Sequence, residues 1–217
     1  MTASDIYSQL IAAFVDWRGV LKDPQYIRRG NEITWSNATH AILPDKLTRA
    51  ETIELSKSGQ FTFRISEDDS ILQISYIFAQ TGDLECARLA YYQVGSSYQV
   101  DEAIDVYPGE DEPSDAPVHW IRFDYVRTQR CRVLHMDSHL HISGMPGMRI
   151  AVEGVPTPKQ FVEFVISHFY ANTYESFRLH GDQQFRNIDQ IDQINSERIT
   201  LHQDAATYQR VPHVRMP

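Results

Sequence analysis

The feature that most constrains the fold is a run of three strand-like segments between residues 61 and 94. Each segment is rich in β-branched and aromatic residues, and the breaks between them carry the turn-forming sequences EDD and QTGD. Connections this short join antiparallel neighbours, because a parallel crossover needs about a dozen residues or more. The run therefore predicts an antiparallel meander, with the segments FTFRIS, SILQISYIFA and LECARLAYYQV.

Three further strand-like segments follow between residues 118 and 154, and they read VHWIRFDYV, RVLHMDSHLHI and RIAVEG. They have the same enrichment in residues that favour a pleated, half-buried surface. Added to the first run, they extend the predicted meander to five or six strands.

Helical periodicity occurs in three places, at residues 4–18, 47–57 and 157–170. The last is the clearest, since Thr157 and Gln160 have the spacing of a capping box at its start. The sequence therefore predicts an α+β fold, in which an antiparallel sheet of five or six strands is packed by an N-terminal helix and by the helix near 157–170.

The chain of 217 residues is long enough for one domain with its own hydrophobic core. We expect a single α+β domain at 1–175, with an acidic loop at 96–117, followed by a polar C-terminal extension at 176–217. Because a disordered tail rarely keeps a regular apolar stripe, we expect a protein partner to dock on the acidic loop or on residues 182–217. The stripe consists of Phe185, Ile188, Ile191 and Ile194.

Charge and cysteine content limit the classes of function. The net charge of −9 argues against non-specific nucleic-acid binding, but seven acidic residues lie within 96–117 and the rest of the chain carries only −2. Nucleic acid therefore stays a candidate substrate. Two cysteines without a CxxC pair, and no apolar run of about 20 residues, indicate a cytoplasmic protein that does not enter a membrane.

The densest cluster of reactive side chains is the segment HMDSHLHI, residues 135–142. Side chains of a strand alternate between its two faces. One face of this segment therefore carries only polar residues, while the other is mainly apolar. The polar face consists of His135, Asp137, His139 and His141.

The preceding segment, VHWIRFDYV, has a matching alternation. Arg122 and Asp124 share one face with Trp120, while the opposite face is mostly apolar. If the two segments pair as antiparallel strands, Arg122 and Asp124 stand beside His139 and His141. This pairing is the main structural prediction for a functional site.

Metal binding is one interpretation of such a cluster. Two histidines at i and i+2 on a strand are roughly 7 Å apart at the backbone. Their rings can therefore converge on one ion, with a carboxylate as a further ligand. We expect His139, His141 and Asp124 as the ligands, and zinc or manganese as the divalent metal.

Acid–base catalysis without a metal is the second interpretation. A histidine pair can take a proton from a nucleophile and return one to a leaving group near neutral pH. Arg122 or Arg149 would neutralise a phosphoryl oxygen, which suits cleavage of RNA through its 2′-hydroxyl. A third interpretation, that the histidines are paired polar residues on a half-buried sheet face, is left open.

Several short motifs in the stretch 120–170, about a quarter of the chain, resemble a bacterial family of unknown function, DUF2290. They are RFDY at 122–125, SHLHI at 138–142, RIAV at 149–152, PTP at 156–158 and the helical residues 161–170. The resemblance implies an intracellular bacterial protein in a defence or toxin–antitoxin-like gene set, and it implies no activity. One departure is that Met136 and Asp137 follow His135 where the family pattern has a proline, which leaves His139 and His141 as the central pair.

The leading hypothesis is a nuclease-like protein that cleaves a phosphodiester of RNA or DNA. His139 and His141 would be metal ligands or an acid–base pair, Asp124 would orient or ligate, and Arg122 and Arg149 would hold the phosphate. The alternative is a non-enzymatic subunit of a larger bacterial defence complex, which would bind a protein partner through the acidic loop and the polar tail.

Overall fold

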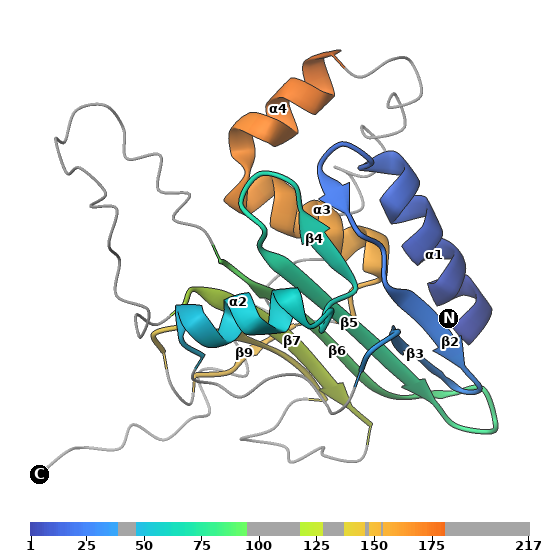
Figure 1. Cartoon of the computed structure of the whole chain (residues 1–217). Helices are drawn as coiled ribbons and strands as arrows, with labels where there is room; N and C mark the ends of the chain where they lie inside the picture. Colours follow the sequence, from blue (N-terminus) through green and yellow to red (C-terminus); the bar gives the residue numbers. More distant parts are fainter. Residues whose placement is uncertain (39–46, 95–117, 128–136, 146–147, 153, 181–217) are drawn as a thin grey trace, which may run out of the picture.

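The computed structural model describes residues 1–38, 47–94, 118–127, 137–145, 148–152 and 154–180. Within these residues the chain forms four α-helices and a single sheet of nine strands (Figure 1), which confirms the predicted α+β fold. The acidic loop and residues 182–217 lie outside them, so the docking role expected for these segments stays a prediction.

All pairs of neighbouring strands in the sheet are antiparallel. The order across the sheet is β1-β4-β5-β6-β7-β8-β9, and β5 also pairs with β3, which in turn pairs with β2. Strands β4 to β9 are the six segments of the predicted meander. The strands are β1 (Leu21–Lys22), β2 (Tyr26–Arg29), β3 (Glu32–Trp35), β4 (Phe63–Ile65), β5 (Ile71–Phe78), β6 (Leu84–Tyr92), β7 (Trp120–Val126), β8 (Ser138–Ile142) and β9 (Ile150–Ala151).

Strands β1 to β3 were not predicted, and they raise the strand number above the expected five or six. Each has only two to four residues, too few for a recognisable alternation. A local signal for β2 and β3 does exist. Arg29 pairs with Glu32, so Gly30 and Asn31 form a two-residue turn in which Gly30 has a φ of 59°. Turns of this kind are typical of tight hairpins.

Three of the four helices begin at a threonine that forms a capping box, which satisfies backbone N–H groups of the first turn. The capping box of Thr157 confirms the predicted start of its helix. The N-terminal helix is capped by Thr2, ahead of the predicted start at residue 4, because Thr2 accepts from the backbone N–H of Asp5. No helix among the described residues is long and apolar enough to cross a membrane. The helices are α1 (Ala3–Asp16), α2 (Arg49–Lys57), α3 (Pro158–Phe169) and α4 (Ala171–His180).

The sheet buries both of its faces, but unequally. The larger core lies between the sheet and helices α1 and α3, and Phe123 of β7 contributes to it. The smaller core lies on the opposite face, where α2 crosses the sheet (Figure 1) and Trp120 packs with Trp35. The alternation along β7 therefore places its apolar face in the larger core, as predicted, and leaves Arg122 and Asp124 on the side of the smaller one.

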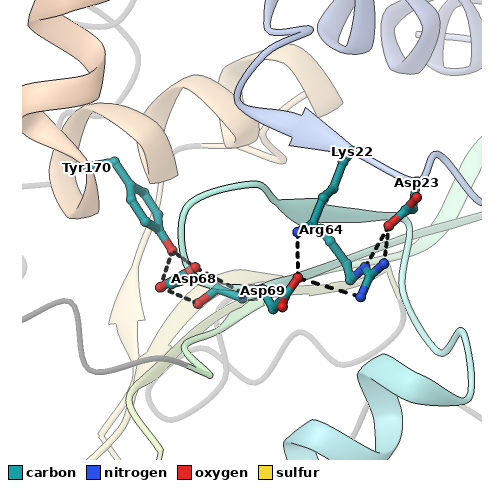
Figure 2. Close-up of polar contacts among 7 residues, drawn as sticks. Lys22, Asp23, Arg64, Asp68, Asp69 and Tyr170 are labelled. Carbon is teal, nitrogen blue, oxygen red and sulfur yellow. Dashed lines mark hydrogen bonds and ion pairs between the residues drawn. The ribbon is translucent and has the colours of Figure 1, made fainter.

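Polar contacts connect the sheet to the end of α3 (Figure 2). Asp69 in the turn between β4 and β5 lies 2.6 Å from Lys22 of β1 and 3.5 Å from Arg64 of β4. In the same turn, both carboxylate oxygens of Asp68 lie 2.9 Å from the hydroxyl of Tyr170, which donates to them. The turn thereby contacts both an edge of the sheet and the helices.

Helix α4 continues to His180, past residue 175, where the predicted domain ends. It packs through aromatic rings, since the centroid of Trp17 lies 5.8 Å from that of Tyr174 and 5.5 Å from that of Phe177. Gly19 makes room for this contact, because a Cβ at that position would lie 3.2 Å from the Phe177 ring. The folded unit therefore includes the first residues of the expected extension.

Candidate functional site

Strands β7 and β8 pair antiparallel, as predicted. The register places Asp124 opposite His139 and Arg122 opposite His141. Because directly opposite residues of neighbouring strands project from the same face, these four side chains form one cluster. Four of the five predicted site residues are thus brought together by one strand pair.

The cluster includes one residue, Arg88, that was not predicted from the sequence. Arg88 of β6 lies directly opposite Asp124 on the other side of β7. In the sequence, the only sign of its role is that Arg88 is a charged residue between Ala87 and Leu89, which are both buried in a central strand. That signal identifies a polar position on one face of β6, but it does not say which strand lies beside it.

Asp124 is the hub of the polar contacts. One of its oxygens, Oδ2, accepts a hydrogen bond from Nε of Arg122 at 2.9 Å and lies 3.3 Å from Nε2 of His141. The second oxygen, Oδ1, lies 3.8 Å from Nε of Arg88. One carboxylate therefore faces three potential donors, one from its own strand β7 and one from each of the neighbouring strands β6 and β8.

The surroundings of Asp124 determine its ionisation. Burial raises the pKa of its carboxyl, whereas the hydrogen bond from His141 and the charge and hydrogen bond of Arg122 lower it. The favourable contacts outweigh the burial, and the pKa lies below its usual range. Asp124 is therefore a carboxylate near neutral pH and can orient a neighbouring imidazole.

The two histidines are adjacent to each other as well as to Asp124. Their ring centroids are 4.7 Å apart and their planes meet at 69°. His139 is buried, while His141 is partly exposed. One potential ligand atom from each of Asp124, His139 and His141 lies within 4.8 Å of the others, so the group can either hold a metal ion after small adjustments or exchange protons with a substrate.

The charge of the groups around Asp124 affects which kind of ligand the cluster attracts. The single negative charge of Asp124 faces two guanidinium groups, so the carboxylate with Arg122 and Arg88 has a net charge of about +1 before either histidine is protonated. A divalent cation adds to this positive charge and is repelled, whereas an anion is attracted. The charge of these three groups is therefore suited to a phosphate-like ligand.

The remaining predicted residues are placed less centrally. Arg149 directly precedes β9 and is exposed. Asp137 directly precedes β8; its Oδ1 is buried, and no described residue hydrogen-bonds to it. His135 lies outside the described residues, so its part in the site is untested. His168, which we did not select, is exposed on α3, and its Nδ1 lies 2.9 Å from the backbone oxygen of Phe164.

Comparison with known proteins adds one finding. No curated protein and no solved structure matches the chain. A protein family described as an uncharacterised conserved protein matches residues 22–209, which include every strand of the sheet except the first residue of β1. The match covers most of the chain and contains all the residues of the candidate site, and the chain therefore belongs to the DUF2290 family.

Proposed function

We propose that this protein is a cytoplasmic nuclease that cleaves RNA by acid–base catalysis with His139 and His141, without a metal ion. The observation that carries the proposal is the contact of Asp124 with His141, beside His139 and between two arginines. A histidine pair with a neighbouring cation is the inventory that transfer of a phosphoryl group to the 2′-hydroxyl requires.

The contacts support a different role for each histidine. Asp124 engages Nε2 of His141, which orients the ring and leaves Nδ1 to face the substrate as the proton donor. His139 then acts as the base and removes the proton of the 2′-hydroxyl. The O2′ attacks phosphorus, the bond from phosphorus to O5′ breaks, and O5′ takes the proton from His141. The products are a 2′,3′-cyclic phosphate and a 5′-hydroxyl.

The test is a cleavage assay with an end-labelled RNA oligonucleotide and a DNA oligonucleotide of the same sequence, with and without EDTA. We expect RNA to be cut, DNA to remain intact and EDTA to have no effect. The variants His139→Ala and His141→Ala should each lose about 100-fold or more in rate, the usual contribution of a general acid or base. His168→Ala is the matched control, since His168 is an exposed histidine on α3.

The results also separate the other interpretations. Cleavage of DNA that EDTA abolishes, with zinc or manganese found by elemental analysis, would instead assign Asp124, His139 and His141 as metal ligands. Equal cleavage by wild type and both histidine variants would exclude this site. Absence of cleavage in every form would leave the role of a subunit in a bacterial defence complex, which depends on segments outside the described residues.

A further inference from the structure

Arg88 and Arg122 differ in how firmly the protein holds them. The guanidinium of Arg122 donates to Asp124 through Nε at 2.9 Å and lies over the ring of Trp120, with its Cζ 5.7 Å from the ring centroid. Its side chain is only 13% exposed. Arg122 is therefore fixed between a carboxylate and an aromatic ring.

Arg88 is held more loosely. Its Nε lies 3.8 Å from Oδ1 of Asp124, which is beyond hydrogen-bond distance. Both atoms are buried, and neither has a hydrogen-bond partner among the residues that the structure describes. A buried donor without an acceptor costs free energy, which a ligand that accepts from it would recover.

The rest of the Arg88 side chain reaches solvent. The side chain is 37% exposed although its Nε is enclosed, so the exposed area belongs to the other atoms, of which the terminal nitrogens are the outermost. A guanidinium can bind two phosphate oxygens at once through its parallel N–H groups. Arg88 thus combines an unsatisfied inner donor with an accessible outer edge.

We propose that Arg88 binds the scissile phosphate of a nucleic-acid substrate, while Arg122 positions Asp124 and His141. This inference deepens the proposed function, because it assigns the phosphate-binding residue of the same site. The phosphate would accept hydrogen bonds from Arg88 on the solvent side of Asp124, next to His139, which lies opposite Asp124 in the register. Arg88 also supplies the positive charge that the anion needs, and it has no hydrogen bond to Asp124 to break, because its Nε lies 3.8 Å from Oδ1.

The experiment measures binding separately from cleavage. The probe is a fluorescein-labelled single-stranded DNA oligonucleotide, which lacks the 2′-hydroxyl and cannot be cut by the proposed reaction. Fluorescence anisotropy over a series of salt concentrations gives both the dissociation constant and its salt dependence. Arg88→Ala is compared with Arg127→Ala as a control. Arg127 directly follows β7, is more than half exposed and forms an ion pair with Asp83.

We expect Arg88→Ala to weaken binding about tenfold or more, the usual effect of losing a charge-assisted hydrogen bond. It should also lower the slope of log affinity against log salt by about 0.7, since one phosphate contact to a single strand is lost. Arg127→Ala should change neither quantity. Arg88→Lys keeps the charge and should bind with intermediate affinity, and it replaces the alanine variant if that variant does not fold.

Two outcomes would overturn the inference: an oligonucleotide that does not bind the wild type, or equal affinities for wild type, Arg88→Ala and Arg88→Lys. These outcomes can be told apart from a failure of the proposed nuclease function. If Arg88→Ala loses binding but the wild type never cleaves RNA, the phosphate site stands and the nuclease does not. If RNA cleavage depends on His141 but binding does not depend on Arg88, the nuclease stands and this inference fails.

Discussion

Asp124 shows how a single side chain connects stability with the proposed chemistry. A carboxylate this deeply enclosed is tolerated because Arg122 and His141 stabilise its charge. The same contacts keep the imidazole of His141 in one orientation. Any change at Asp124 should therefore affect both the folded state and the site, whereas changes at the histidines should affect mainly the site.

Replacement of Asp124 by alanine should lower the free energy of unfolding by about 3 kcal/mol, because it leaves the nearly buried guanidinium of Arg122 without its carboxylate. Urea denaturation followed by tryptophan fluorescence measures this loss. The matched control is Asp83→Ala, which breaks the exposed ion pair with Arg127 and should leave the unfolding midpoint unchanged. Similar losses in the two variants would show that the contacts of Asp124 contribute no more to stability than an exposed ion pair does.

The contribution of Asp124 to stability should depend on pH. Folding lowers the pKa of this carboxyl below 3.8, its value when unperturbed, so the contribution is fully present above that value and is lost as the pH falls through the folded pKa. The difference in unfolding free energy between wild type and Asp124→Asn should be constant near neutral pH and should shrink as the pH approaches and passes 3.8. A difference that is the same at every pH would contradict the ionised state assigned to Asp124.

The elements of the fold are joined by a few specific contacts rather than by apolar burial alone. The turn between β4 and β5 contacts the end of α3 through Asp68 and Tyr170, and Tyr170 also lies 2.9 Å, hydroxyl to hydroxyl, from Tyr91 of β6. Burial raises the pKa of Asp68, while the hydrogen bonds from Ser70 and Tyr170 oppose that rise. The tyrosine thus stabilises a carboxylate that burial alone would disfavour.

Removal of this hydroxyl in Tyr170→Phe should lower the free energy of unfolding by about 2 kcal/mol, since the hydrogen bond to a partly buried charged group is lost and the ring is kept. Chemical denaturation of the purified protein gives the value. Tyr7→Phe on α1 is the control, because no described residue forms a hydrogen bond with its hydroxyl. A loss of equal size at both positions would argue against a specific role for Tyr170.

At the scale of the whole molecule, helix α4 is the last element of the described fold and packs against its beginning. Its aromatic residues cover Trp17 at the end of α1, so the N-terminal and C-terminal parts of the described chain meet on the same side of the sheet (Figure 1). The boundary expected after residue 175 would cut this helix between Tyr174 and Phe177, which both contact Trp17.

Two truncated chains test this boundary. The chain 1–180 should unfold at the same temperature as the full chain, because it keeps every described contact of α4. The chain 1–170 should unfold roughly 4–8 °C lower, since it loses about 2 kcal/mol of apolar contact with Trp17. Thermal unfolding followed by circular dichroism measures both, and Phe177→Ala in the full chain should shift the transition in the same direction. Equal transition temperatures for the two truncated chains would assign α4 to the extension instead.

The sequence by itself determined the local features, including the helix that begins at Thr157, the meander of β4 to β9 and the faces of β7 and β8. These features follow from capping chemistry and from side-chain alternation within a few residues, and both are visible in one segment of the chain. The predicted neighbours His139 and Asp124 could be inferred because each strand showed which of its faces was polar.

Only the tertiary structure decided the rest. Strands β1 to β3 are too short to show a period, although Gly30 and Asn31 signal the turn between β2 and β3. They form because β1 pairs with β4, and because β3 pairs with β5 and in turn with β2. Arg88 joined the site through the register between β6 and β7, and a slip of one residue would have turned it to the opposite face. Such a register depends on the packing of both faces of the sheet at once, which no single segment of the sequence contains.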